Sequence, residues 1–101
     1  MRLTYPTALV LQALLDGRHH GFDIMDATGL PSGTVYPILR RLDAEGCVRS
    51  RWEKDGLARK QQRPPRRYYE LTRDGLERLE AARARFPILG ALPARAKPRR
   101  A

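Results

Sequence analysis

The spacing of apolar residues predicts three helices in the first half of the chain. Residues 5–16 carry a broad apolar stripe at helical spacing, formed by Val10, Leu11, Leu14 and Leu15. A shorter segment with apolar residues at its centre predicts a helix over 21–28. Residues 32–45 carry a third stripe, formed by Val35, Ile38, Leu39 and Leu42, and Gly46 follows where a helix commonly ends.

After Gly46 the pattern changes to alternation, which is typical of strands. Residues 47–53 predict a first strand and residues 66–71 a second. The intervening residues, 54–65, are too polar for an element of the core. The pattern therefore predicts an antiparallel hairpin with a long basic tip.

A fourth helix is expected between Thr72, a good N-cap, and Pro87. Its apolar stripe is formed by Leu76, Leu79, Ala82 and Phe86. This stripe can pack on the first helix or on a second subunit, and we treat it as a candidate dimer interface. Residues 87–101 combine proline with alanine, arginine and lysine, and we expect a flexible tail there. The predicted organisation is thus a domain over 1–86 and a tail over 87–101.

The order of these elements predicts a mainly helical fold with a small two-stranded hairpin. Helix, helix, helix, strand, strand, helix is the order of a winged helix–turn–helix domain. In such a domain the third helix fits the major groove of DNA, and the hairpin, or wing, reaches the neighbouring groove or backbone.

The charge of the chain points to an anionic partner. Lys and Arg number 20 against 11 Asp and Glu in 101 residues, for a net charge of +9. Residues 51–67 hold seven basic and two acidic side chains, and residues 87–101 hold four basic and none acidic. The first of these blocks falls on the predicted wing, so nucleic acid is the first expectation and a membrane surface the second.

Candidate DNA contacts lie on the third helix and on the hairpin. The helix offers Ser32, Thr34, Tyr36, Arg40 and Arg41, and the hairpin offers Lys54, Arg59, Lys60, Arg63, Arg66 and Arg67. Each has a simpler interpretation: Ser32 can be only an N-cap, Tyr36 can pack its ring against the wing, and the arginines can be solvated.

Cysteine, histidine and tryptophan are the remaining residue types that could carry chemistry or bind a ligand. The single Cys47 cannot form an internal disulfide, and we expect a small buried apolar side chain. His19 and His20 have no third ligand nearby, so a turn or surface role is favoured over a metal site. Trp52 is expected in the core, with a ligand pocket as the alternative. We expect neither a metal nor a cofactor.

Several sequence strings resemble the PadR family of bacterial transcriptional regulators. They are residues 21–24 (GFDI), 32–42 (SGTVYPILRRL), Glu45-Gly46, Trp52-Glu53, and 66–72 (RRYYELT) with Gly75. The resemblance covers roughly residues 7–86. It implies a homodimeric, repressor-like protein that binds a palindromic operator. It also implies a recognition helix beginning with Ser32, Thr34 and Tyr36, a wing over 54–67, and a pocket for aromatic effectors near Trp52.

The leading hypothesis is a sequence-specific regulator that binds double-stranded DNA. The alternatives are a sequence-independent architectural DNA binder and a winged-helix module that binds protein. An enzyme is not expected, because the sequence shows no nucleophile–base pair, paired carboxylates or phosphate-binding loop. No apolar stretch approaches the roughly 20 residues that span a bilayer. Residues 8–15 loosely resemble a signal peptide but lack a cleavage site, so a cytoplasmic chain is expected.

Overall fold

The computed structural model describes residues 3–91. Its order of elements is that of a winged helix–turn–helix domain, with two short helices that the sequence did not predict. The elements are α1 (Tyr5–Leu15), α2 (Gly21–Thr28), α3 (Ser32–Ala44), β1 (Val48–Trp52), α4 (Asp55–Lys60), β2 (Arg67–Leu71), α5 (Arg73–Arg85) and α6 (Ile88–Ala91).

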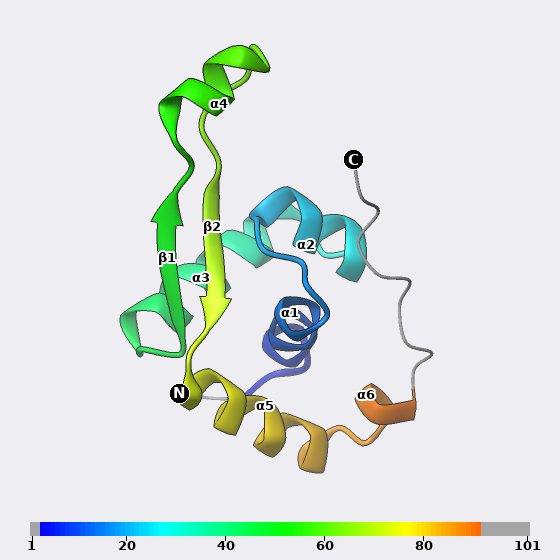
Figure 1. Ribbon diagram of the computed structural model, residues 1–101. Helices are drawn as coiled ribbons and strands as arrows, with labels where there is room; N and C mark the ends of the chain where they lie inside the picture. The colour runs from blue at the N-terminus through cyan, green and yellow to red at the C-terminus, as the bar shows by residue number, and fades with distance from the viewer. Residues whose placement is uncertain (1–2, 92–101) are drawn as a thin grey trace.

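Helix α1 runs through the middle of the domain, with α2, α3, β2 and α5 packed around it (Figure 1). The Thr4 side chain caps it by accepting a hydrogen bond from the Thr7 backbone N–H at 3.3 Å. Its apolar side chains form the main core together with the buried faces of α2, α3, the two strands and α5. The predicted stripe is buried except for Leu15, which is 44% exposed.

The turn between α2 and α3 fixes the angle at which α3 crosses the domain. Gly29 ends α2 in the left-handed conformation, at φ 75°, and its N–H donates to the Met25 carbonyl oxygen. Helix α3 begins at Ser32 as predicted, but its N-cap is Pro31, which has no side chain able to cap, instead of Ser32. The stripe from Val35 to Leu42 is buried, so the polar face of α3 is directed outward.

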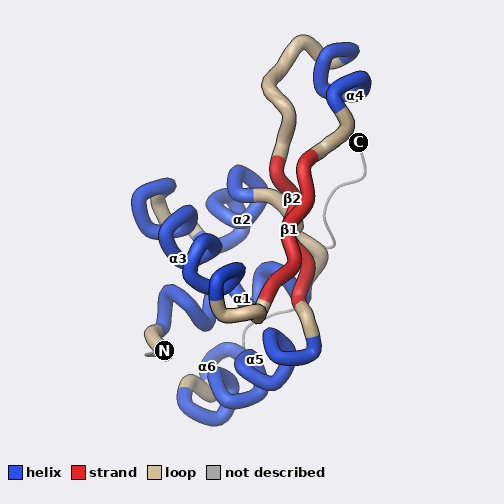
Figure 2. The backbone as a smooth tube through the Cα atoms, turned by 90° about the vertical axis from the view of Figure 1, so that its left-hand side faces the viewer, coloured by secondary structure: helices blue, strands red, loops and turns tan. Residues whose placement is uncertain are grey.

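The two strands pair antiparallel and project away from the helices (Figure 2). Their register pairs Val48 with Leu71 and Trp52 with Arg67. The segment before α2 adds an isolated bridge, in which His20 pairs with Tyr68 and the Tyr69 N–H donates to the His19 carbonyl oxygen at 2.7 Å. The wing is therefore anchored to the start of α2 as well as to the core.

The basic tip of the hairpin contains a helix that the sequence pattern did not predict. Helix α4 occupies Asp55–Lys60 at the far end of the wing (Figure 1). The helix ends in a Schellman motif: the Arg63 N–H donates to the Ala58 carbonyl oxygen and the Gln62 N–H to the Arg59 carbonyl oxygen, each at 3.1 Å. Gln62 occupies the left-handed position of that motif, at φ 55°.

The C-terminal helices correct the predicted domain boundary. Thr72 caps α5 as predicted, accepting from the Gly75 N–H, but α6 follows Pro87 and packs back on the domain. Leu89 of α6 is buried against Ala8 and Ala82. The folded part thus extends past residue 86, while the rest of the predicted tail, 92–101, lies outside the described residues. Within residues 3–91, no helix has the length and hydropathy that a membrane span requires.

Candidate nucleic-acid interface

Helix α3 carries five of the eleven residues that the sequence selected for DNA contact. Ser32, Tyr36, Arg40 and Arg41 are exposed, and Thr34 is half-buried. The helix dipole and the uncapped first N–H groups make its N-terminal end attractive to anions. The outer face of α3 has the width, polarity and charge that the major groove accepts.

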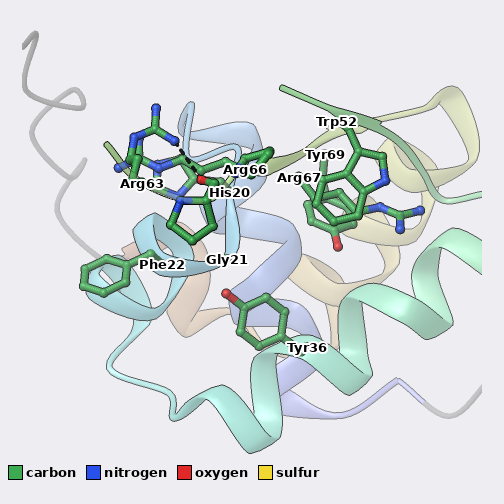
Figure 3. Close-up of a pocket in the computed structure, with 11 residues that line it drawn as sticks. His20, Gly21, Phe22, Tyr36, Trp52, Arg63, Arg66, Arg67 and Tyr69 are labelled. Carbon is green, nitrogen blue, oxygen red and sulfur yellow. Dashed lines mark hydrogen bonds between the residues drawn. The ribbon is translucent and has the colours of Figure 1, made fainter. Parts of the chain in front are cut away.

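Tyr36 has a packing role in addition to its place on this face. Its ring lies over Gly21, the first residue of α2, so closely that a Cβ built on Gly21 would lie 2.4 Å from ring atoms. The ring therefore packs against the start of α2, a contact that neither interpretation from the sequence included. The Tyr36 hydroxyl group remains at the rim of the cleft described below (Figure 3).

At the base of the wing, Arg67 is held by three side chains, two from β1 and one from α3. Its Nη2 donates to Ser50 Oγ at 2.7 Å and to Asp43 Oδ2 at 3.3 Å, and its guanidinium lies 5.4 Å from the centre of the Trp52 ring. Trp52 itself is 62% exposed, so the expectation that it belongs to the core is wrong. It lies on the same face of β1 as Val48, but at the end of the strand that projects away from the helices, so the core does not cover it.

Further along the wing, Glu53 gathers an ion pair that the sequence did not predict. Its carboxylate accepts from Arg63 at 2.5 and 2.7 Å, from the Tyr68 hydroxyl at 3.0 Å and from the Arg66 backbone N–H at 3.2 Å. The Arg63 hydrogen bonds, with those of Arg66 and Tyr68, lower the pKa of Glu53 to about 2 although burial opposes this shift. Glu53 therefore stays ionised at neutral pH, and the Arg63 guanidinium is engaged in this ion pair.

The other predicted wing cations are differently placed. Lys54, Arg59 and Lys60 are exposed at the start and end of α4 on the tip, and Arg66 is exposed where the tip rejoins β2. Within residues 3–91 none of these four forms an ion pair. They are therefore the wing side chains best able to meet phosphates.

A cleft of about 510 Å³ opens between the start of α3 and the wing. Figure 3 shows aromatic side chains along it, with arginines at the wing side. It brings together Tyr36, Arg63, Arg66 and Arg67 from the predicted set, with Phe22, Trp52 and His20 as additional lining residues. A second groove, of about 400 Å³, joins Arg40 and Asp43 of α3 to Arg67. Tyr36 and Arg40 of α3 thus lie on one face with Arg66 and Arg67 of the wing base, whereas Lys54, Arg59 and Lys60 line neither cleft.

The two histidines have structural positions. The His20 Nδ1 accepts from the Asp23 N–H at 3.3 Å and caps α2, and its ring meets Tyr68 edge to face. Burial, followed by the nearby Arg66, lowers the pKa of His20, which keeps the ring neutral and able to accept. Cys47 is buried, as expected, and burial raises the pKa of its thiol.

The stripe predicted as a dimer interface is divided between two environments. Leu79 and Ala82 are buried within this chain against α1 and α6. Phe86 is half-buried, with its ring 5.4 Å from that of Tyr5. Leu76 is 44% exposed and is the one member of the stripe that is open to a partner.

Sequence reasoning missed Phe22, Asp43 and Glu53 as components of this face. The pattern gives Phe22 no role beyond that of an apolar residue in the predicted helix 21–28, yet its side chain is 73% exposed. A signal for Glu53 was present, because it is one of only two acidic residues in the basic block 51–67. Its partner, ten residues further along the chain, could not be selected without the fold.

Comparison with known proteins agrees with this architecture. The sequence profile described as the Transcriptional regulator PadR-like family matches residues 10–81. A PadR family transcription regulator from hypervirulent Clostridium difficile superposes with a TM-score of 0.67 at 22% identity, covering 87% of this chain and 93% of that chain. No curated protein matches the chain by sequence.

Two regulators solved with bound molecules are also similar to this chain. A MepR mutant of S. aureus bound to an oligodeoxyribonucleotide has a TM-score of 0.65 at 21% identity, covering 88% of this chain and 62% of that chain. The PcaV transcriptional regulator of Streptomyces coelicolor, in complex with its natural ligand, has a TM-score of 0.64 at 26% identity, covering 91% of this chain and 64% of that chain. The chain thus spans less than two thirds of the length of either.

Proposed function

The chain belongs to the PadR-like family of transcriptional regulators, and we propose that it acts by binding a specific sequence of double-stranded DNA, as a repressor. The observation that carries the proposal is the shared face of α3 and the wing, where Arg40 and Arg67 border one groove and Tyr36 and Arg66 border the next. A regulator of this kind works where the chromosome is, so the proposed location is the bacterial cytoplasm.

In this proposal the recognition contacts divide by element. Helix α3 enters the major groove, with Arg40 directed at base edges and Ser32 near phosphates at the helix start. The wing cations Lys54, Arg59, Lys60 and Arg66 neutralise phosphates of the adjacent backbone. Phosphate contacts hold the register, and base contacts choose the sequence.

We propose that two copies bind together as a homodimer on a palindromic site. Support comes from Leu76, which stays exposed on α5 while its neighbours in the stripe are buried. Half-sites about 34 Å apart are expected for two recognition helices on one face of the duplex.

Leu76→Glu should shift the protein to monomers in sedimentation velocity, with the exposed neighbour Glu77→Gln as the control. Equal sedimentation of both variants and the wild type would contradict this interface.

The cleft supports a second proposal, that a small aromatic effector binds between α3 and the wing. Its volume lies in the range of ordinary ligand pockets, and aromatic faces and guanidinium groups line it. A ligand there would occupy the surface that DNA needs. Trp52 is the single tryptophan of the chain, so quenching of its fluorescence by an aromatic carboxylate is the direct test. No quenching at millimolar concentration would argue against the effector.

The experiment that tests the main proposal is selection from a random duplex library at about 150 mM salt, close to physiological screening. Enrichment of a two-fold symmetric motif is the expected result. Retention of duplexes without enrichment would indicate a sequence-independent architectural binder. Absence of retention even at low salt would leave a winged helix that binds protein, and would overturn the proposal.

A further inference from the structure

The tip of the wing, residues 54–65, is not held in place by the hydrophobic core. Neither of the two apolar clusters among the described residues includes a member of this segment, and Ala58, though buried, belongs to neither. The strand ladder ends at the pair Trp52 and Arg67. Something else must therefore set the direction in which α4 extends.

Glu53 lies at the point where the ladder ends and is hydrogen-bonded to three other residues of the wing. Its backbone N–H donates to the Arg66 carbonyl oxygen at 2.7 Å, which adds one more pair of residues to the hairpin. Its side chain accepts hydrogen bonds from the Arg63 guanidinium, the Arg66 N–H and the Tyr68 hydroxyl group. We call this set of hydrogen bonds the brace. With 5% of the residue exposed, the carboxylate is surrounded by donors and little open to water.

Arg63 reaches Glu53 from the C-terminal turn of α4. Its backbone closes the Schellman motif of that helix by donating to the Ala58 carbonyl oxygen. The same residue therefore fixes the end of α4 through its backbone and the base of the tip through its side chain. A bidentate pair of this kind fixes orientation as well as distance, since both guanidinium N–H groups must face both carboxylate oxygens.

An acidic residue at this position is unfavourable for simple electrostatic attraction to DNA. The wing attracts phosphates through a net positive block, and each carboxylate in that block reduces the attraction. Glu53 also removes Arg63 from the cations that are free to bind. Geometry, not charge, is the benefit that such a buried pair can supply.

We propose that Glu53 is a positioning residue for DNA binding: through the brace it directs α4 so that Arg59 and Lys60 reach the phosphate backbone. This inference rests on the proposed function. It reassigns Arg63 from the predicted DNA contacts to the brace.

The test compares two substitutions that change charge equally. Glu53→Gln and Glu70→Gln each remove one negative charge from the hairpin, but Glu70 is exposed on β2 opposite Arg49 and takes no part in the brace. Binding to the selected duplex, or to a random-sequence duplex of similar length, is measured between about 50 and 200 mM salt. Charge alone predicts that both variants bind at least as tightly as the wild type.

The brace predicts that the two variants differ in DNA affinity and in its salt dependence. Glu70→Gln should keep the wild-type salt slope, whereas Glu53→Gln should bind roughly tenfold more weakly at low salt, with a slope shallower by about two units as two phosphate contacts are lost. The preference of Glu53→Gln for the selected duplex over a scrambled one should persist, because α3 is untouched. General destabilisation of the domain would lower both affinity and preference.

A second pair of variants keeps the net charge constant. Arg63→Lys retains the charge but loses the planar fork, and should reproduce the shallower slope, while Arg59→Lys on the exposed tip should retain the wild-type slope. Equal affinities and slopes for Glu53→Gln and Glu70→Gln would overturn the inference. Failure of the wild type to bind any duplex would instead overturn the proposed function on which it rests.

Discussion

The ring of Tyr36 lies over the α-carbon of Gly21, where a single added methyl group would come within 2.4 Å of it. This contact joins the start of the recognition helix α3 to the start of α2. It explains why a glycine occupies the first position of α2: only a residue without Cβ allows the tyrosine ring to come so close. The position of Tyr36 on the candidate DNA face thus depends on a glycine of α2 that offers no side chain of its own for contact.

Gly21→Ala is therefore expected to destabilise the protein by about 1–3 kcal/mol, as overpacking usually does. Urea unfolding measures this directly. Gly33→Ala is the matched control, because a Cβ on Gly33 in α3 meets nothing within 4 Å. It should be neutral or stabilising by at most about 1 kcal/mol, since alanine favours helix. Similar losses for both variants would contradict the packing of Tyr36 on α2.

The arginines of α3 and of the tip should differ in the kind of binding energy they supply. Arg40→Ala is expected to cost roughly 1–3 kcal/mol on the best duplex and to relax the preference at one base pair. Replacing Arg59 and Lys60 together should weaken binding to every sequence and flatten the salt slope by about two units. Competition titrations against single-base variants separate the two effects. Uniform weakening by Arg40→Ala would make it a phosphate contact instead.

Gln62 offers a test of the structure of the tip itself. The left-handed conformation raises the free energy of a residue with a Cβ by about 1–2 kcal/mol. Gln62 adopts this conformation, at φ 55°. Gln62→Gly removes that strain, so the opening free energy of α4 should rise by up to about 1 kcal/mol, seen as slower amide exchange at residues 57–63. Gln61→Gly, at a position with φ −93°, has no strain to relieve and should speed exchange. Faster exchange in both would argue against the Schellman motif.

The low pKa of Glu53 predicts the pH range in which the wing is stable. A carboxyl group with a pKa of about 2 in the folded protein, below its ordinary 4.5, stabilises the folded state when ionised. That stabilisation is complete above pH 4.5 and is lost as the pH falls towards 2. Trp52 fluorescence and urea unfolding should therefore be insensitive to this group between about pH 5 and 8.

Below pH 4.5 the wild type should lose more stability than Glu53→Gln, which has no carboxyl group to protonate. Parallel acid titrations of the two proteins make the comparison. Coincident pH profiles would show that the hydrogen bonds from Arg63 and the other partners of Glu53 add nothing to the free energy of unfolding.

The two helices missing from the sequence prediction share a physical cause. Helices α4 and α6 have six and four residues, well below the length at which a helix is stable by itself. Short segments carry too few residues to show a periodic stripe. Leu89 is buried only because α1 and α5 meet beside it, and α4 forms where the two strands separate.

The sequence by itself determined the order of the main elements, the buried stripes of α1 and α3 and the concentration of positive charge on the wing. These features are local, because periodicity, capping and composition are properties of neighbouring residues. Only the tertiary structure decided which cations are free. Arg63 pairs with Glu53 ten residues away and Arg67 with Asp43 24 residues away, and Trp52 faces outward beside them. Such pairs depend on which elements meet in space, and the spacing of residues along a chain does not contain that information.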